Sequence, residues 1–79
     1  MDEKHVPKLL VNIFDAANEE VLDFGQLIEW PTGATLPLVG EQLRVHGHGD
    51  LQVVRRLFHI GLLVDDLIVD LFVGYVIDE

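Results

Sequence analysis

Leu51 to Ile77 reads LQVVRRLFHIGLLVDDLIVDLFVGYVI, a run rich in β-branched and aromatic residues with an acidic pair, Asp65-Asp66, inside it. Such runs are typical of strands, and two adjacent acidic residues between them are typical of a turn. We therefore predict a long C-terminal hairpin in which Asp65-Asp66 forms the turn. In this register Val64 pairs with Leu67, and Phe58 lies opposite Val73.

The predicted register gives the hairpin one coherent apolar face, because side chains alternate between the two faces of a strand. Arg56 is the one charged member of this face and lies opposite Tyr75, where its guanidinium could cover the ring. The face comprises Val54, Arg56, Phe58, Ile60, Leu62 and Val64 on one strand and Leu67, Val69, Leu71, Val73, Tyr75 and Ile77 on the other.

The opposite face of the hairpin is mixed, and it carries more large aliphatic residues than a solvated face needs. A chain of 79 residues is too short to bury both faces of this hairpin. We therefore predict that the second face forms a homodimer interface, or a contact with another protein, and that Phe72→Glu dissociates the dimer. The predicted interface residues are Leu57, His59, Leu63, Ile68, Phe72 and Val76.

Two more strands are expected in the N-terminal part, at Lys8–Phe14 and Val21–Ile28. The polar residues between them suit a turn. They also suit a short helix beginning at Asp15, because aspartate is a good N-cap and acidic residues favour a first helical turn. The hairpin is the simpler interpretation, and both remain open.

The middle of the chain combines an irregular connection with a third pair of strands. Trp30 to Gly40 contains two prolines and two glycines, which disfavour both a helix and a central strand. Beyond it, Gln42–His46 and Leu51–Val54 flank Gly47-His48-Gly49-Asp50, a run typical of a turn. This arrangement pairs His46 with Leu51 and Leu43 with Val54.

Leu36 to Val45 reads LPLVGEQLRV and is followed by a glycine-rich turn and a valine-rich strand. The pattern resembles that of small bacterial and phage β-barrel proteins of unknown function. The resemblance covers about half of the chain and implies a barrel without implying an activity.

The strand pattern and this resemblance together define the expected fold. We predict one domain over residues 1–79, either a small antiparallel β-barrel or a strongly bent sheet of about five strands. It ends in the long hairpin from Leu51 to Ile77 and includes one short helix only if Asp15 begins one.

The charge of the chain limits its partners. It has 14 acidic residues and 5 lysines and arginines, a net charge of -9, and a pI near 4.6. Such a chain repels nucleic-acid phosphates and anionic membranes, so we expect neither as a partner. Its acidity does allow a different role, as a nucleic-acid mimic or inhibitor of the kind that phages encode.

Nothing in the sequence directs the chain to a membrane or out of the cell. Arg55, Arg56, Asp65, Asp66 and Asp70 interrupt the apolar region from 53 to 77, so no charge-free window of about 18 residues remains to span a bilayer. The N-terminus, Met1 to His5, lacks the basic and apolar regions of a signal peptide. We therefore expect a cytoplasmic protein.

The residue types present argue against catalysis. Cysteine and serine are absent, and no phosphate-binding glycine loop occurs. We predict a protein that is not an enzyme and needs no cofactor, and that acts as a self-associating interaction module.

A small-ligand or metal-binding barrel is a further alternative. His46, His48 and Asp50 lie around two glycines, and imidazole and carboxylate groups are competent zinc or nickel ligands. Trp30, the single tryptophan, would mark a ligand pocket or would close the open end of a small barrel.

Overall fold

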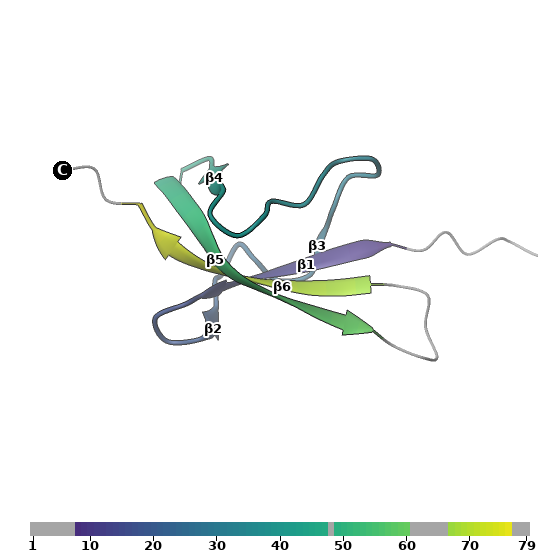
Figure 1. Cartoon of the computed structure of the whole chain (residues 1–79), viewed down its shortest axis with the longest axis horizontal. Coiled ribbons are helices and arrows are strands. Elements are labelled where there is room, and N and C mark those ends of the chain that lie inside the picture. The colour runs from purple at the N-terminus through teal and green to yellow at the C-terminus, as the bar shows by residue number, and fades with distance from the viewer. Residues whose placement is uncertain (1–7, 48, 61–66, 77–79) are drawn as a thin grey trace, which may run out of the picture.

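The computed structural model describes residues 8–47, 49–60 and 67–76 (Figure 1). These residues form a single sheet and no helix, which confirms the mainly β prediction. The short helix considered at Asp15 is therefore absent from the described ranges. The strands are β1 (Leu9–Asp15), β2 (Glu20–Val21), β3 (Ile28–Glu29), β4 (Gln42–Val45), β5 (Gly49–Ile60) and β6 (Leu67–Tyr75).

The sheet is mixed, whereas the sequence pattern predicted a purely antiparallel arrangement. Its order is β2-β1-β6-β5-β4, with β3 also pairing with β1, and β1 runs parallel to β6. The amide of Leu67 donates to the carbonyl of Lys8 at 3.0 Å, and that of Ala16 to Val73 at 2.9 Å. Because these strands are far apart in the chain, no local turn marks their pairing, and the sequence pattern could not reveal it.

The six strands do not close into a barrel, contrary to one of the two predicted forms. In the described residues, β4 pairs only with β5, while β2 and β3 pair only with β1. Side chains bridge the two edges instead, because Ile28 and Trp30 pack on the same core as Leu43 and Val45. Figure 1 shows the chain after β3 crossing one side of the sheet to reach β4.

The register of the C-terminal hairpin differs from the prediction by four residues. Phe58 lies opposite Val69 instead of Val73, and Arg56 lies opposite Leu71 instead of Tyr75. Because four is an even number, each residue of this region keeps its predicted face. The predicted turn at 65–66 lies outside the described residues.

A β-bulge between Val53 and Arg55 changes the composition of the apolar face. The extra residue, Val54, leaves that face and is exposed, whereas Leu51 and Val53 are buried. A bulge of this kind reverses the alternation of side chains along a strand, and no glycine or proline in the sequence indicates this one.

The pairing of β4 with β5 also differs from the prediction. Leu43 lies opposite Leu51, and Val45 opposite Gly49, so the chain reverses between Val45 and Gly49. Gly47 and Gly49 both have positive φ, a conformation that glycine adopts without strain. The tighter turn begins β5 two residues earlier than expected.

The N-terminal hairpin forms, but its second strand is interrupted. Asp15 stabilises the turn through its Oδ1, which accepts from the amide of Ala17 at 2.8 Å. The predicted strand Val21–Ile28 is a strand only at its two ends, in β2 and β3. The chain between them leaves the strand conformation and approaches Ile13 of β1. There the carbonyl of Gly25 accepts from the amide of Ile13 at 2.7 Å.

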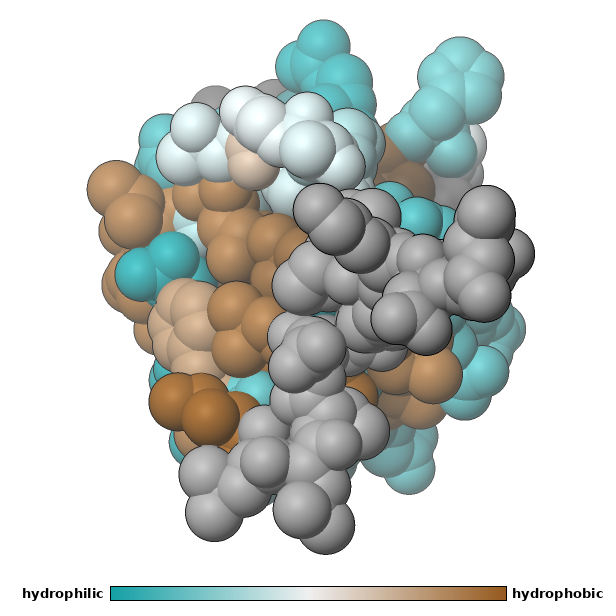
Figure 2. All heavy atoms as spheres, turned by 90° about the vertical axis from the view of Figure 1, so that its right-hand side faces the viewer, coloured by the Kyte–Doolittle hydropathy of each residue, from teal (hydrophilic) through white to brown (hydrophobic). Residues whose placement is uncertain are grey.

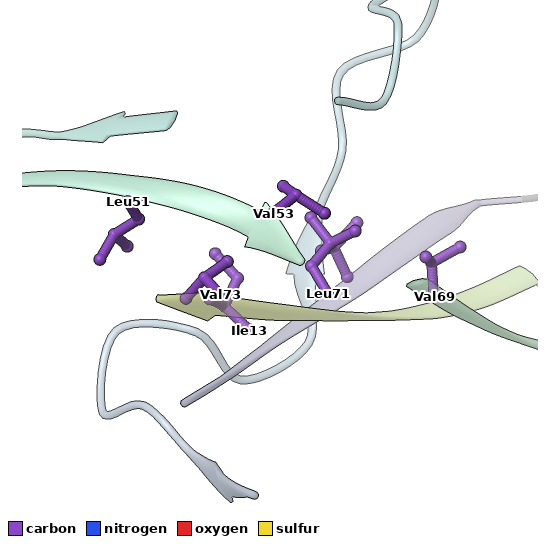
Figure 3. Packing of buried hydrophobic residues seen from close by; sticks show 7 residues of the cluster. Ile13, Leu51, Val53, Val69, Leu71 and Val73 are labelled. Atoms are coloured by element: carbon purple, nitrogen blue, oxygen red, sulfur yellow. The ribbon is translucent and has the colours of Figure 1, made fainter. Parts of the chain in front are cut away.

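The core lies on one side of the central strands β1, β6 and β5 (Figure 3). Alternate residues of each strand supply it, as the period of two requires. Burial of each such side chain contributes about 1.5–3 kcal/mol. The buried members are Val11, Ile13, Leu51, Val53, Val69, Leu71 and Val73.

Candidate interaction surface

Two stacked aromatic side chains, Phe14 and Phe72, partly cover the face of the sheet opposite the core. Phe72 is only 6% exposed, because the Arg55 guanidinium carbon lies 3.9 Å from its ring centroid and Phe14 stacks beside it at 5.1 Å. Arg55 is held in place by Glu19, with Nη2 3.4 Å from Oε1. Phe72 therefore belongs to the protein's own packing and is not an exposed side chain.

A polar row next to these rings joins three strands. Asp70 is 7% exposed, and its Oδ2 lies 2.6 Å from Nε2 of His59. Asn12 donates to Asp70 Oδ1 at 3.1 Å and accepts from the amide of Leu27 at 2.8 Å. Asp70, the polar side chain that this face buries in the described part of the chain, thus has partners for both of its oxygens, as stable burial requires.

The predicted interface residues that lie in β5 and β6 of the described structure share one face but differ in exposure. Leu57 is exposed, and the His59 side chain is half-exposed. Ile68 and Val76 are half-buried. Phe72 is buried, and Leu63 lies outside the described residues. The interface over this whole set stays a prediction.

Four exposed apolar side chains of the sheet lie close together on one strand, β5. We call Val54–Ile60 of β5 the β5 edge segment. Four of its residues are between 44% and 78% exposed, and they are Val54, Leu57, Phe58 and Ile60. Figure 2 views the end of the molecule where β5 stops and β6 begins, and shows hydrophobic side chains gathered there.

The β5 edge segment has a backbone edge that no described residue pairs. β4 covers β5 only from Gly49 to Gln52, and the preceding loop reaches Val53, whose amide donates to Glu41 at 2.9 Å. Beyond the bulge, β5 pairs with β6 alone. The sequence contains one signal for this unpaired edge. The predicted strand Gln42–His46 is shorter than the predicted strand that begins at Leu51, so part of the longer strand has no partner on that side.

The turn with the predicted metal ligands contains an ion pair. Arg44 Nε lies 2.8 Å from Asp50 Oδ1, and this hydrogen bond holds the pKa of Asp50 below its ordinary value. His46 is exposed, and His48 lies outside the described residues. The described residues contain no group of three potential ligands close enough to hold a metal. The metal site stays a prediction.

Trp30 lies at a groove of about 340 Å³ between the two edges of the open sheet. Its indole N–H is buried and has no acceptor in the described parts of the chain. The walls are mainly apolar, and one of them is formed by β4 and the turn after it. The lining residues are Ile13, Phe24, Ile28, Trp30, Leu43, Arg44, Val45 and His46.

Acidic residues gather where β1 turns into β2. Asp15, Glu20 and Asp23 line one shallow hollow there. Glu19 from the same turn contacts Arg55 instead. The acidic pair at 65–66, which a mimic would need on the same surface, lies outside the described residues.

The described ranges include no helix with the length and hydrophobicity to cross a membrane. Comparison with protein-family models, with curated proteins and with solved structures finds no match to this chain.

Proposed function

We propose that the chain is a non-enzymatic interaction module that self-associates as a homodimer through the β5 edge segment. One observation carries this proposal. Four large apolar side chains are exposed within seven consecutive residues, on a strand whose outer edge is unpaired in the described structure.

A free strand edge favours association because its N–H and C=O groups can pair with those of another strand. Proteins commonly block such edges with charged side chains. Here Arg55 lies over Phe72 and Arg56 over Phe58, with the Arg56 guanidinium carbon 5.2 Å from the ring centroid. Both guanidinium groups therefore lie over faces of the sheet, and they leave the outer backbone edge of β5 accessible.

The test is the oligomeric state in solution. Sedimentation velocity over micromolar concentrations is expected to show a monomer–dimer equilibrium. Ile60→Lys should weaken dimerisation by at least about tenfold, since it places a cation at the apolar edge beside the two arginines of this segment. Val39→Lys is the matched control, because Val39 is 58% exposed but lies in the connection after β3.

Two results would contradict the proposal. One is a wild-type protein that stays monomeric at all concentrations. The other is an equal effect of Ile60→Lys and Val39→Lys, which would show that added charge, and not its place on β5, weakens association. Circular dichroism of both variants controls for unfolding.

The groove at Trp30 favours a second candidate function, the binding of a small apolar ligand. Its volume lies at the lower end of the range for ligand sites, and its walls are predominantly apolar. Because Trp30 is the single tryptophan, its fluorescence reports directly on this groove. Octanol is expected to change the emission in a saturable way, and Val45→Phe should weaken that response by filling the groove. A linear, unsaturable response would exclude such a site.

A further inference from the structure

We infer that the dimer forms by antiparallel pairing of β5 with β5 of a second copy, about a two-fold axis at Phe58. The inference rests on the proposed function and specifies its geometry. The result is one continuous sheet through both copies, in which each copy uses the edge of β5 that is unpaired in the described residues.

The direction of the backbone groups follows from the hydrogen bonds of β6. Leu67 donates its amide to β1, and Val73 accepts there through its carbonyl. Backbone groups alternate in direction along a strand, so Ile68, Asp70 and Phe72 turn theirs toward β5.

Their partners on β5 are His59, Leu57 and Arg55, respectively. These three residues therefore direct their backbone groups inward, to β6. The residues between them and beyond them, Arg56, Phe58 and Ile60, direct their N–H and C=O groups to the open edge.

An axis at Phe58 matches all three outward residues. Phe58 pairs with Phe58 of the second copy, and Arg56 pairs with Ile60 in both directions. Each pair exchanges two hydrogen bonds. An axis at Leu57 or at His59 would match only two outward residues per copy within the described strand.

Charge also favours the Phe58 axis. Leu51 to Ile60 has no acidic residue and two arginines, so the edge is locally basic in a chain of net charge -9. An axis at Arg56 would set two guanidinium groups directly opposite each other, which is destabilising. The Phe58 axis sets Arg56 opposite the aliphatic Ile60 and brings the two phenyl rings together, with Leu57 opposite His59 on the other face.

The absence of cysteine allows a direct test by crosslinking. A hydrogen-bonded antiparallel pair has its Cα atoms about 5.5 Å apart, within the range of a disulfide. Phe58→Cys should therefore oxidise rapidly to a covalent homodimer. Arg56→Cys and Ile60→Cys should each crosslink slowly alone but rapidly when mixed. Thr35→Cys, in the exposed connection after β3, is the control for random collision.

The outcomes separate this inference from the proposed function. A wild-type monomer at all concentrations overturns both. A wild-type dimer in which Phe58→Cys crosslinks no faster than Thr35→Cys, or in which Leu57→Cys crosslinks fastest, overturns the register alone.

Hydrogen exchange of the wild-type protein provides a test without substitution. The amides of Arg56, Phe58 and Ile60 should become protected as concentration rises through the dimerisation range, while the inward amides stay protected throughout. Outward amides that exchange equally fast at all concentrations, in a protein that dimerises, would overturn the edge pairing.

Discussion

His59 and Asp70 face each other across β5 and β6, with Nε2 of the histidine 2.6 Å from Oδ2 of the carboxylate. Asn12, on the other side of β6, holds the second carboxylate oxygen at 3.1 Å. A buried carboxylate is costly unless its oxygens are bound, and these two neighbours supply the contacts. The three residues thus fasten β1, β6 and β5 together on the face opposite the core.

Asp70→Ala is expected to destabilise the fold by about 1–3 kcal/mol, because it leaves Asn12 and His59 without their shared acceptor. Urea unfolding followed by circular dichroism measures the loss. Asp23→Ala is the control, since Asp23 is exposed, and should lie within about 0.5 kcal/mol of the wild type. Equal stability of the two variants would mean that the polar row contributes nothing net.

Gly25→Ala should also destabilise, by roughly 1–3 kcal/mol. A Cβ at Gly25 would lie 2.6 Å from Ile13 Cβ and 2.9 Å from the Ile13 carbonyl oxygen, and the backbone cannot move away without losing its hydrogen bond to Ile13. Gly74→Ala is the matched control, because a Cβ there meets nothing within 4 Å. Thermal unfolding should lower the melting temperature of the first variant only. A lowered melting temperature of both would point to a general cost of replacing glycine by alanine in this protein.

The faces of the C-terminal hairpin could be predicted, whereas its register could not. Alternation assigns Phe58 and Val69 to one face whatever their partners are, because the side-chain period is two. Register depends on the turn and on bulges, and the bulge at Val54 has no local signal in the sequence. The parallel pairing of β1 with β6 was equally hidden, because it joins the two ends of the chain.

The candidate surface could be predicted only in part, because alternation indicates the face on which a residue lies but not which residues are its neighbours. Leu57 and His59 were assigned to an exposed face from their position in the strand. Phe72 was assigned there too, but the sequence gives no sign that Arg55 and Phe14 cover it, since these contacts depend on which strands are neighbours. The exposed edge at Phe58 and Ile60 follows from the short length of β4.

The contact between Arg55 and Phe72 should be measurable by a double-mutant cycle. We expect Arg55→Gln to destabilise the wild type more than it destabilises Phe72→Leu, with a coupling of about 0.5–1 kcal/mol. Urea unfolding of the four proteins yields this value. The salt bridge to Glu19 is exposed and contributes little, so the coupling should persist in 0.5 M salt, a concentration that weakens surface ion pairs. A coupling that disappears with salt would assign the effect to Glu19.

The pair of Arg44 and Asp50 predicts how the β4–β5 turn responds to acid. The hydrogen bond from Arg44 lowers the pKa of Asp50, so the folded state binds a proton less readily than the unfolded state. The stabilisation is therefore fully present above the unfolded pKa of about 3.9, and it is lost as pH falls through the lower folded pKa. Nuclear magnetic resonance titration of the Asp50 carboxyl should show this depressed pKa, and Arg44→Gln should raise it toward the ordinary value. An Asp50 pKa that does not change in Arg44→Gln would show that the ion pair does not persist in solution, and would leave the carboxylate free for a metal beside His46.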